Sequence, residues 1–274
     1  MVSSKTLRAI GLFTAAVVAS GAGAQAPKNG RWVVDWGEHR CTLVREIGGG
    51  TGITVLVRTY IGTHQPEVII INPSWTKAPV SDRSSVELAL LPGGHTVQVE
   101  AATGTTKADK TQLLLLSKLD NDFFDRFAEA RGLSLTHRGE KLLNVGFAGS
   151  AAAINSLRAC NDDLMKSWGV DLEARKRLQR MPLRKNPERM WLTHNDYPAA
   201  ALNQNAQGPV VIRFIVGADG LPRECVPVVS SKNKDLDHRT CKALTSRVTF
   251  EPGLDENGKP VPVVLVQTVT WRLE

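Results

Sequence analysis

The chain has 274 residues, of which 42% are hydrophobic and 5% aromatic, and its formal net charge is +7. The positive excess is moderate and the few aromatic side chains do not alternate with basic ones as base-stacking sites require, so a nucleic-acid-binding protein is disfavoured. A soluble basic protein that works near anionic surfaces fits this charge better.

Residues 1–24 have the three parts of a secretory signal peptide. A charged start with Lys5 and Arg8 precedes an apolar run over residues 9–19, and small residues end the segment at Ala24. This order predicts export and cleavage after Ala24. The alternative is an uncleaved membrane anchor, but the apolar run is shorter than the roughly 20 residues that cross a bilayer. About 250 residues then remain, a length that favours two domains.

Cys41, Cys160, Cys225 and Cys241 are the four cysteines of the chain. In an exported protein an even number of cysteines predicts disulfides, and four cysteines allow three connectivities. Pairing within each segment, 41 with 160 and 225 with 241, is the simplest of the three, and the connectivity stays open. If the entropy of loop closure determines how much a disulfide stabilises the fold, a 225–241 bridge contributes about 3 kcal/mol and the longer bridge somewhat more.

Residues 29–165 predict a β-rich domain. Short apolar and β-branched runs are separated by turns rich in glycine, proline and asparagine, as in antiparallel sheets. The turns at 92–94 and 138–139 predict hairpins between the strands that flank them. The expected strands cover residues 32–36, 53–57, 68–71, 86–90, 96–99, 113–116, 133–135 and 142–145.

Two helices are expected within this domain. The first starts at Asn121 or Asp122 and ends at Gly132. The second covers residues 151–160, with Ser150 as its N-cap. The side chains expected to pack inward are Phe123, Phe124, Phe127 and Ala128 on the first helix and Ala152, Ala153, Leu157 and Cys160 on the second.

Several short motifs are spread over this domain: Trp32, Cys-Thr-Leu at 41–43, Asn-Pro-Ser-Trp at 72–75, and the segments 147–152 and 157–160. Together they resemble the invasion-associated locus B family of exported proteins. The resemblance implies a β-sandwich-like domain and no known chemistry.

Residues 166–190 differ from their surroundings because basic side chains outnumber acidic ones. We expect a short helix followed by a solvated linker, with docking on anionic phospholipid headgroups as the alternative. The basic residues of this region are Lys166, Arg175, Lys176, Arg177, Arg180, Arg184, Lys185 and Arg189.

Residues 191–274 hold the most regular pattern of the chain. Pro198 suits the first turn of a helix, and the Asp-Gly pair at 219–220 predicts a turn between two strands. Pro227 removes a hydrogen-bond donor from the second strand, which should therefore be an edge strand or contain a bulge. The expected elements are a helix over 199–202, strands over 210–216 and 224–230, a helix over 236–247 and a strand over 261–271.

The landmarks of this domain follow one another in order: Tyr-Pro-x-x-Ala at 197–201, Gly-x-Val at 208–210, Phe-x-Val-x-x-Asp-Gly at 214–220 and Phe-x-Pro at 250–252. In this order they resemble the C-terminal domain of TonB energy transducers. The resemblance implies a three-stranded antiparallel sheet with two helices on one face. It also implies a protein partner, because in that family the domain captures a short extended segment of outer-membrane receptors by adding it to a sheet edge.

By this resemblance the final strand is the docking edge, and the residues around Tyr197 also contact the partner. A periplasmic location, an outer-membrane receptor or another envelope protein as the partner, and a link to TonB-dependent transport follow from it. Self-pairing of the same edge in a homodimer is an alternative use. The predicted partner-binding residues are His194, Asn195, Tyr197, Val263, Leu265, Gln267, Val269 and Trp271.

The expected chain is thus α+β, with a β-rich sandwich-like domain at 29–165, a basic linker at 166–190 and a TonB C-terminal-like domain at 191–274. TonB transducers have an uncleaved inner-membrane helix and a long proline-rich spacer, and neither is expected here. Energy transduction is therefore the least favoured of three hypotheses. The others are a receptor-binding module and a structural envelope protein that uses the TonB-like fold as a scaffold.

No sequence pattern of an enzyme or of a cofactor site is present. The chain lacks Gly-x-Ser-x-Gly, His-Glu-x-x-His and Cys-x-x-Cys, and the glycine run at 48–52 lacks the lysine of a phosphate-binding loop. Asp235, Asp237 and His238 could suggest a metal site, but helix capping and solvation explain them better. We expect no catalytic residues, no metal and no cofactor.

Overall fold

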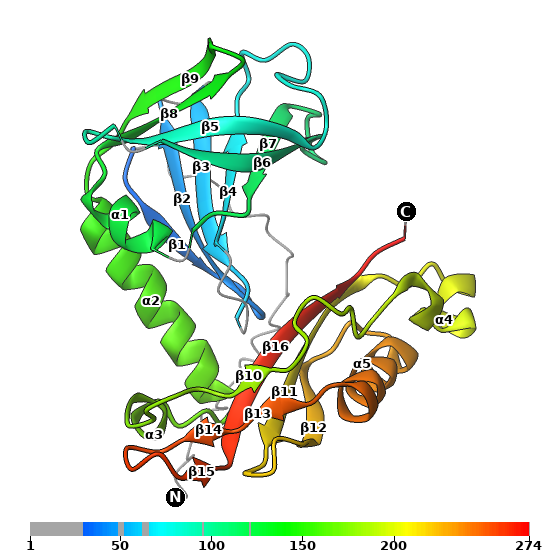
Figure 1. Cartoon of the computed structure of the whole chain (residues 1–274). Helices are drawn as coiled ribbons and strands as arrows, with labels where there is room; N and C mark the ends of the chain where they lie inside the picture. The colour runs from blue at the N-terminus through cyan, green and yellow to red at the C-terminus, as the bar shows by residue number, and fades with distance from the viewer. Residues whose placement is uncertain (1–29, 49–51, 62–65, 95, 121, 274) are drawn as a thin grey trace, which may run out of the picture.

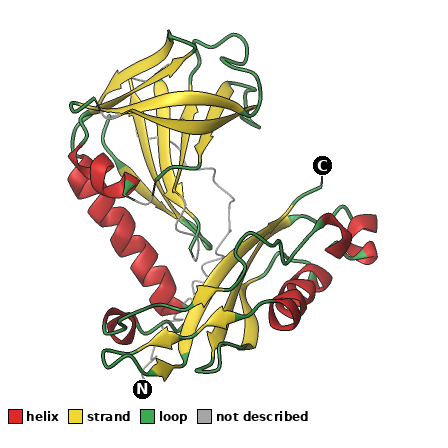
Figure 2. Ribbon diagram, viewed as in Figure 1, coloured by secondary structure: helices red, strands yellow, loops and turns green. Residues whose placement is uncertain are grey.

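A computed structural model describes residues 30–48, 52–61, 66–94, 96–120 and 122–273 of the chain (Figure 1). The predicted signal peptide, most of the glycine run at 48–52 and the predicted cap at Asn121 lie outside these residues. Figure 2 shows a β-rich N-terminal unit, a mixed C-terminal unit and a long helix that runs between them. None of the helices in the described residues combines the length and the hydropathy that a bilayer crossing requires. The α+β class is confirmed.

Nine strands form one continuous antiparallel sheet in the N-terminal unit, in the order β1-β2-β3-β4-β7-β6-β5-β8-β9. The sheet is strongly curved, so its two halves face each other across a shared core (Figure 1). The unit is sandwich-like in its layers, although its strands belong to a single sheet. The strands are β1 (Val33–Trp36), β2 (Cys41–Ile47), β3 (Ile53–Thr59), β4 (Pro66–Ile71), β5 (Ser84–Leu91), β6 (Thr96–Thr105), β7 (Gln112–Ser117), β8 (Gly132–His137) and β9 (Glu140–Gly146).

Alternating burial along most strands explains why the sequence predicts them. In β3, Val55 and Val57 are fully buried while Leu56 between them is not, which is the two-residue period of a strand. Strand β2 lacks this alternation, because its first four residues, 41–44, are all buried. Helix α2 packs against the core face of β2, where Cys41 and Leu43 share one cluster with Leu157 and Cys160. The sequence does not predict β2, because burial of four successive residues removes the two-residue period and Arg45 and Glu46 interrupt the apolar run.

Helices α1 (Phe123–Glu129) and α2 (Ser150–Ser167) flank the curved sheet (Figure 1). The prediction that Ser150 caps α2 is wrong: Gly149 is the N-cap, and the Ser150 hydroxyl donates to the carbonyl of Ala130 at 2.7 Å. The helix also continues past Cys160 to Ser167. It does so because the first residue that favours an end is Gly169, whose φ of 80° is left-handed.

The buried face of α2 differs from the predicted face at two positions. Ala153, Leu157 and Cys160 are buried as expected, but Ala152 is exposed and Ile154 is fully buried in its place. Because a helix turns by 100° per residue, this moves the buried stripe slightly around the helix axis.

Both disulfides join cysteines of the same unit. Cys41–Cys160 connects β2 to α2 across a sequence separation of 119, and Cys225–Cys241 spans a separation of 16 in the C-terminal unit. Within the described residues no cysteine is free. The pairing is the simplest of the three connectivities.

The C-terminal unit is built on a three-stranded antiparallel sheet in the order β12-β11-β16. Helices α4 and α5 lie on one of its faces (Figure 1). The short ladders β10 with β13 and β14 with β15 accompany the sheet. The elements are α3 (Leu172–Lys176), β10 (Leu183–Arg184), the 3-10 helix η1 (His194–Asp196), α4 (Ala199–Asn203), β11 (Gly208–Val216), β12 (Pro222–Val229), α5 (Lys234–Arg247), β13 (Phe250–Glu251), β14 (Gly253–Leu254), β15 (Pro260–Val261) and β16 (Val263–Trp271).

The face of this sheet opposite α5 is covered as well. Val266 of β16 packs in one cluster with Ile61, Val170 and Leu172, and the Thr268 hydroxyl donates to the carbonyl of Ile61 at 3.1 Å. The end of α2, helix α3 and the chain at Ile61 therefore cover the second face. The two units share a small apolar core there.

The basic segment 166–190 folds against the C-terminal unit. Leu172 is buried in the shared core, and Arg184 of β10 pairs with Phe250 of β13. Several of its basic side chains, including those of Lys185 and Arg189, are nonetheless exposed. The backbone of this segment is thus held in place while much of its charge faces solvent.

Strand β12 has the irregularity that Pro227 predicts. Val229 and Pro227 pair with successive residues of β11, so Val228 between them forms a bulge. A second register shift lies near Glu224, whose φ of 52° is left-handed. Strand β12 is also the edge of the sheet opposite β16. The prediction of an edge strand or a bulge is confirmed in both respects.

We expect the Cys41→Ala/Cys160→Ala double substitution to destabilise the protein more than Cys225→Ala/Cys241→Ala. The longer bridge restricts the unfolded chain more, and loop-closure entropy gives about 5 kcal/mol for it against about 3 kcal/mol for the shorter one. Urea unfolding followed by far-ultraviolet circular dichroism measures both losses. Equal losses would show that local packing, and not the length of the closed loop, determines what each bridge contributes.

Candidate protein-binding edge

The outer edge of β16 is the open part of the C-terminal sheet. Within the described residues β16 pairs with β11 on one side and with no strand on the other. Both faces of the sheet are covered, and the opposite edge, β12, is interrupted by two prolines, a bulge and a left-handed residue. An added strand needs a regular row of free backbone N–H and C=O groups. Strand β16 offers that row.

A cavity of about 370 Å³ lies beside the C-terminal half of β16. One wall is the end of that strand, and the other is the segment 190–197 that leads into α4. The lining residues are Met190, Leu192, Thr193, His194, Tyr197, Val269, Thr270, Trp271, Arg272 and Leu273. An extended chain beside β16 could place a side chain in this hollow.

The structure brings four of the predicted partner-binding residues, His194, Tyr197, Val269 and Trp271, around this cavity. The remaining four do not line it. Asn195 is exposed on η1, and Val263 is buried at the far end of β16. Leu265 packs in the core beneath α5, and Gln267, two residues further along β16, is half-buried.

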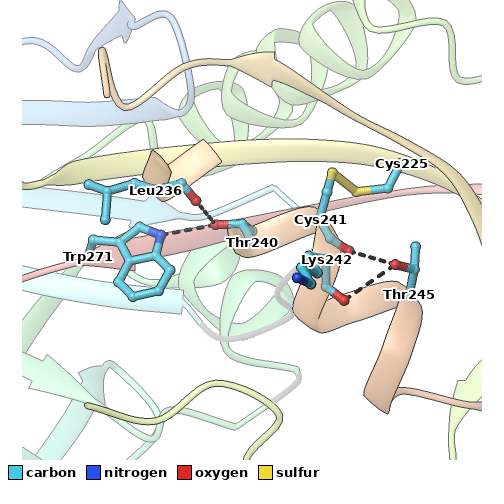
Figure 3. Close-up of a disulfide and its surroundings, with 7 residues drawn as sticks. All are labelled: Cys225, Leu236, Thr240, Cys241, Lys242, Thr245 and Trp271. Atoms are coloured by element: carbon cyan, nitrogen blue, oxygen red, sulfur yellow. Dashed lines mark hydrogen bonds between the residues drawn. A yellow bond between two sulfur atoms is a disulfide. The ribbon is translucent and has the colours of Figure 1, made fainter. Parts of the chain in front are cut away.

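Trp271 fixes the end of β16 to helix α5 (Figure 3). Its indole Nε1 donates to the hydroxyl of the fully buried Thr240 at 2.9 Å, and that hydroxyl donates to the carbonyl of Leu236 at 2.8 Å. The Tyr197 ring meets the Trp271 ring edge-on, with centroids 5.0 Å apart, and the Tyr197 hydroxyl donates to the carbonyl of Ala206. Burial raises the pKa of the Tyr197 hydroxyl, so it remains a donor.

Helix α5 is tied to both outer strands of the sheet. Cys241 forms the disulfide to Cys225 of β12, and the neighbouring Thr240 bonds to Trp271 of β16 (Figure 3). The Thr245 hydroxyl donates to the carbonyl of Cys241 one turn away. These contacts hold β16 in register with the helix that covers it.

Asp196 holds the other wall of the cavity in place. Its carboxylate accepts from the backbone N–H of Thr193 at 2.8 Å and from the Thr193 hydroxyl at 3.1 Å, which forms a capping box around η1. It also pairs with Arg239, and with Arg247 at 2.8 Å, both on α5. The Arg247 guanidinium in turn donates to the carbonyl of Trp191 at 3.1 Å. One buried carboxylate thus connects the segment 191–196 to α5.

The pKa of Asp196 reflects these bonds. Burial by itself raises the pKa of the carboxyl, but the hydrogen bonds from Thr193, Arg239 and Arg247 outweigh it and lower the pKa from 3.8 to about 2. The charged form is therefore favoured in the folded state. Its contribution to stability is present above pH 3.8 and is lost as the pH falls through about 2.

The described residues contain no group of three or more histidine, cysteine or acidic side chains that could hold a metal ion. Asp237 is buried and accepts hydrogen bonds from the Ser231 N–H at 2.9 Å and from the hydroxyls of Ser230 and Ser231. It closes the turn before α5. The chemistry that the site offers is backbone hydrogen bonding and apolar contact.

Sequence reasoning missed part of the cavity wall. Met190 and Leu192 line the cavity, and Met190 is 73% exposed. An exposed methionine next to an open strand edge suggests a contact surface, because its flexible side chain adapts to different partners. The signal was present only as an isolated methionine within a basic run.

We expect Asp196→Asn to lower the free energy of unfolding by about 2 kcal/mol near neutral pH, because two arginines lose a buried charged acceptor. The difference from the wild type should shrink as the pH falls from 3.8 toward 2, where the wild-type carboxylate is protonated. Chemical unfolding across this pH range measures it, with the exposed Asp235→Asn as the matched control. A difference that stays constant down to pH 2 would contradict the role of the charge.

We expect Thr240→Val to cost about 1–3 kcal/mol, because it leaves the indole N–H of Trp271 buried without an acceptor. Trp271→Phe in the same protein removes that donor, so the double variant should lose less than the two single losses added together. Thermal unfolding of the wild type, the two single variants and the double variant gives the coupling free energy between Thr240 and Trp271. Additive losses would show that this hydrogen bond does not hold β16 to α5.

Residues 193–273 match the sequence model of a family described as the Gram-negative bacterial TonB protein C-terminal. The match spans η1 to β16 and therefore includes the whole three-stranded sheet with α4 and α5. No curated protein is significantly similar to the chain. The resemblance of the N-terminal unit to the invasion-associated locus B family stays a prediction. The C-terminal part of this chain, residues 193–273, belongs to the TonB C-terminal domain family.

Proposed function

We propose that this is a periplasmic envelope protein whose C-terminal domain binds an extended segment of another protein as a fourth strand beside β16. The observation that carries the proposal is the open outer edge of β16 in a sheet whose two faces are both covered. Strand addition draws its affinity from main-chain hydrogen bonds and its specificity from pockets for alternate side chains. In this proposal the 370 Å³ cavity at the end of β16 is the pocket for one of these side chains.

The family supports a choice of partner. In TonB transducers this domain captures a short segment of outer-membrane receptors, so a receptor of that class, or another envelope protein with an exposed extended segment, is the partner we propose. A link to TonB-dependent transport follows from this choice. Energy transduction is not part of the proposal, because a folded β-rich unit and helix α2 precede the domain where a TonB transducer has an extended spacer.

A second function is favoured by a specific observation. The cluster of Ile61, Val170, Leu172 and Val266 joins the two units through the second face of the C-terminal sheet. This contact suits a structural envelope protein in which the TonB-like domain is a scaffold. The two functions differ in whether β16 takes up a strand from outside.

Proline substitution of neighbouring residues in β16 tests strand addition. Successive N–H groups of an antiparallel strand point to opposite edges. One of the two substitutions, Val269→Pro or Thr270→Pro, therefore removes a hydrogen bond to β11, and the other removes an N–H that faces outward. We call the second protein the outward variant. We expect the outward variant to keep its fold and to bind at least about tenfold more weakly. Calorimetric titration with synthetic segments of outer-membrane receptors measures this, and thermal unfolding identifies the outward variant.

Hydrogen exchange gives a second measurement on the unmodified protein. A bound strand should slow exchange in residues 263–271 and leave the exchange of β12 unchanged. If no receptor segment binds, the outer-membrane receptor is excluded as the partner. If a segment binds the wild type and the outward variant equally, strand addition at β16 is excluded and the scaffold function is favoured. Exchange protection that rises with protein concentration alone would instead indicate a homodimer through this edge.

A further inference from the structure

A second cavity, of about 570 Å³, adjoins the cavity beside β16, and four of its lining residues are basic. Arg184, Lys185 and Arg189 come from the segment before η1, and Arg247 comes from the last turn of α5. Among the described residues that line it there is no aspartate or glutamate. The hollow therefore concentrates positive charge in one place.

Three of these four basic side chains form no ion pair with the described residues, although Glu188 adjoins Arg189 in the chain. Arg247 pairs with Asp196 at 2.8 Å, whereas Arg184 donates to a neutral backbone carbonyl. Lys185 and Arg189 are exposed, and in the part of the chain that the structure describes neither forms an ion pair. Neighbouring like charges raise the local potential, so the cavity attracts an anion.

The two cavities share part of their wall. Met190 and Thr193 line both of them, so the flank of a ligand that lies beside β16 comes close to the basic cavity. The basic cavity also has apolar lining from Trp191 and Val248, and its volume lies in the usual range for ligand pockets. A concave site of this kind fits the side chains of a bound peptide better than a flat layer of lipid headgroups.

We propose that the segment captured beside β16 carries acidic side chains next to its strand-forming part, and that these carboxylates bind Arg184, Lys185 and Arg189. Hydrogen bonds between such cations and carboxylates are stronger than neutral ones. This inference rests on the proposed strand addition and specifies the chemistry of the partner. The basic segment 166–190 is then part of the binding site.

Selection from a random library of displayed peptides, each about 12 residues long so that a strand and its flank fit, tests the inference on the full mature protein. We expect the wild type to select alternating apolar peptides flanked by Asp or Glu. The Lys185→Gln/Arg189→Gln variant should select the same apolar pattern without the acids. Lys234→Gln/Lys242→Gln on the exposed face of α5 is the matched control with the same change of charge.

Titration of one selected peptide and of its Glu→Gln and Asp→Asn counterpart gives the magnitude. The acidic form should bind the wild type roughly tenfold more tightly than the amide form, and the ratio should fall toward one in the Lys185→Gln/Arg189→Gln variant and at high salt. The control variant should keep the wild-type ratio.

The outcomes separate the two proposals. Peptides that depend on β16 but show no preference for acids overturn the acidic partner and leave strand addition intact. Failure to select any peptide that is sensitive to the outward proline variant overturns strand addition itself. Absence of acid selection together with co-sedimentation with phosphatidylglycerol vesicles, lost in the Lys185→Gln/Arg189→Gln variant, would assign these cations to a lipid surface and overturn the inference.

Discussion

Burial of both faces of the β12-β11-β16 sheet determines what the C-terminal domain can do. Helices α4 and α5 cover one face, and the end of α2 with α3 covers the other. A sheet enclosed in this way can meet another protein only along its edges. Because Pro227 and the bulge at Val228 interrupt β12, the regular row of backbone groups on β16 is the available contact.

The carboxylate of Asp196 holds in place the segment that lies beside the edge of β16. By bonding Thr193 and two arginines of α5, it fixes the segment that forms a wall of both cavities. The same carboxylate pairs with Arg247 as well as Arg239, so the cations of the basic cavity that form no ion pair with described residues are at positions 184, 185 and 189. One buried group therefore sets both the shape and the charge of the site.

Most strands of the fold can be predicted from the sequence because their side chains alternate. The final strand, and His194, Tyr197, Val269 and Trp271 as residues of one site, are predicted because the TonB landmarks are short motifs that can be found in the sequence. The predicted helix over 151–160 is too short, because the first residue after Cys160 that favours a helix end is Gly169. The basic cavity could not be predicted from the sequence either. From the sequence alone, Lys185 and Arg189 belong to a solvated basic run. The fold places them beside the C-terminal turn of α5.

The wall beside β16 also bears on whether this edge pairs with a partner or with a second copy. A free peptide can enter between β16 and the segment 190–197, since it consists of a single strand. A second copy of β16 brings its own segment 190–197 to the same place, and both segments must fit beside strands that pair at a spacing of about 5 Å. The net positive charge of each chain adds repulsion. Shape and charge therefore both favour an extended acidic segment over self-association at this edge.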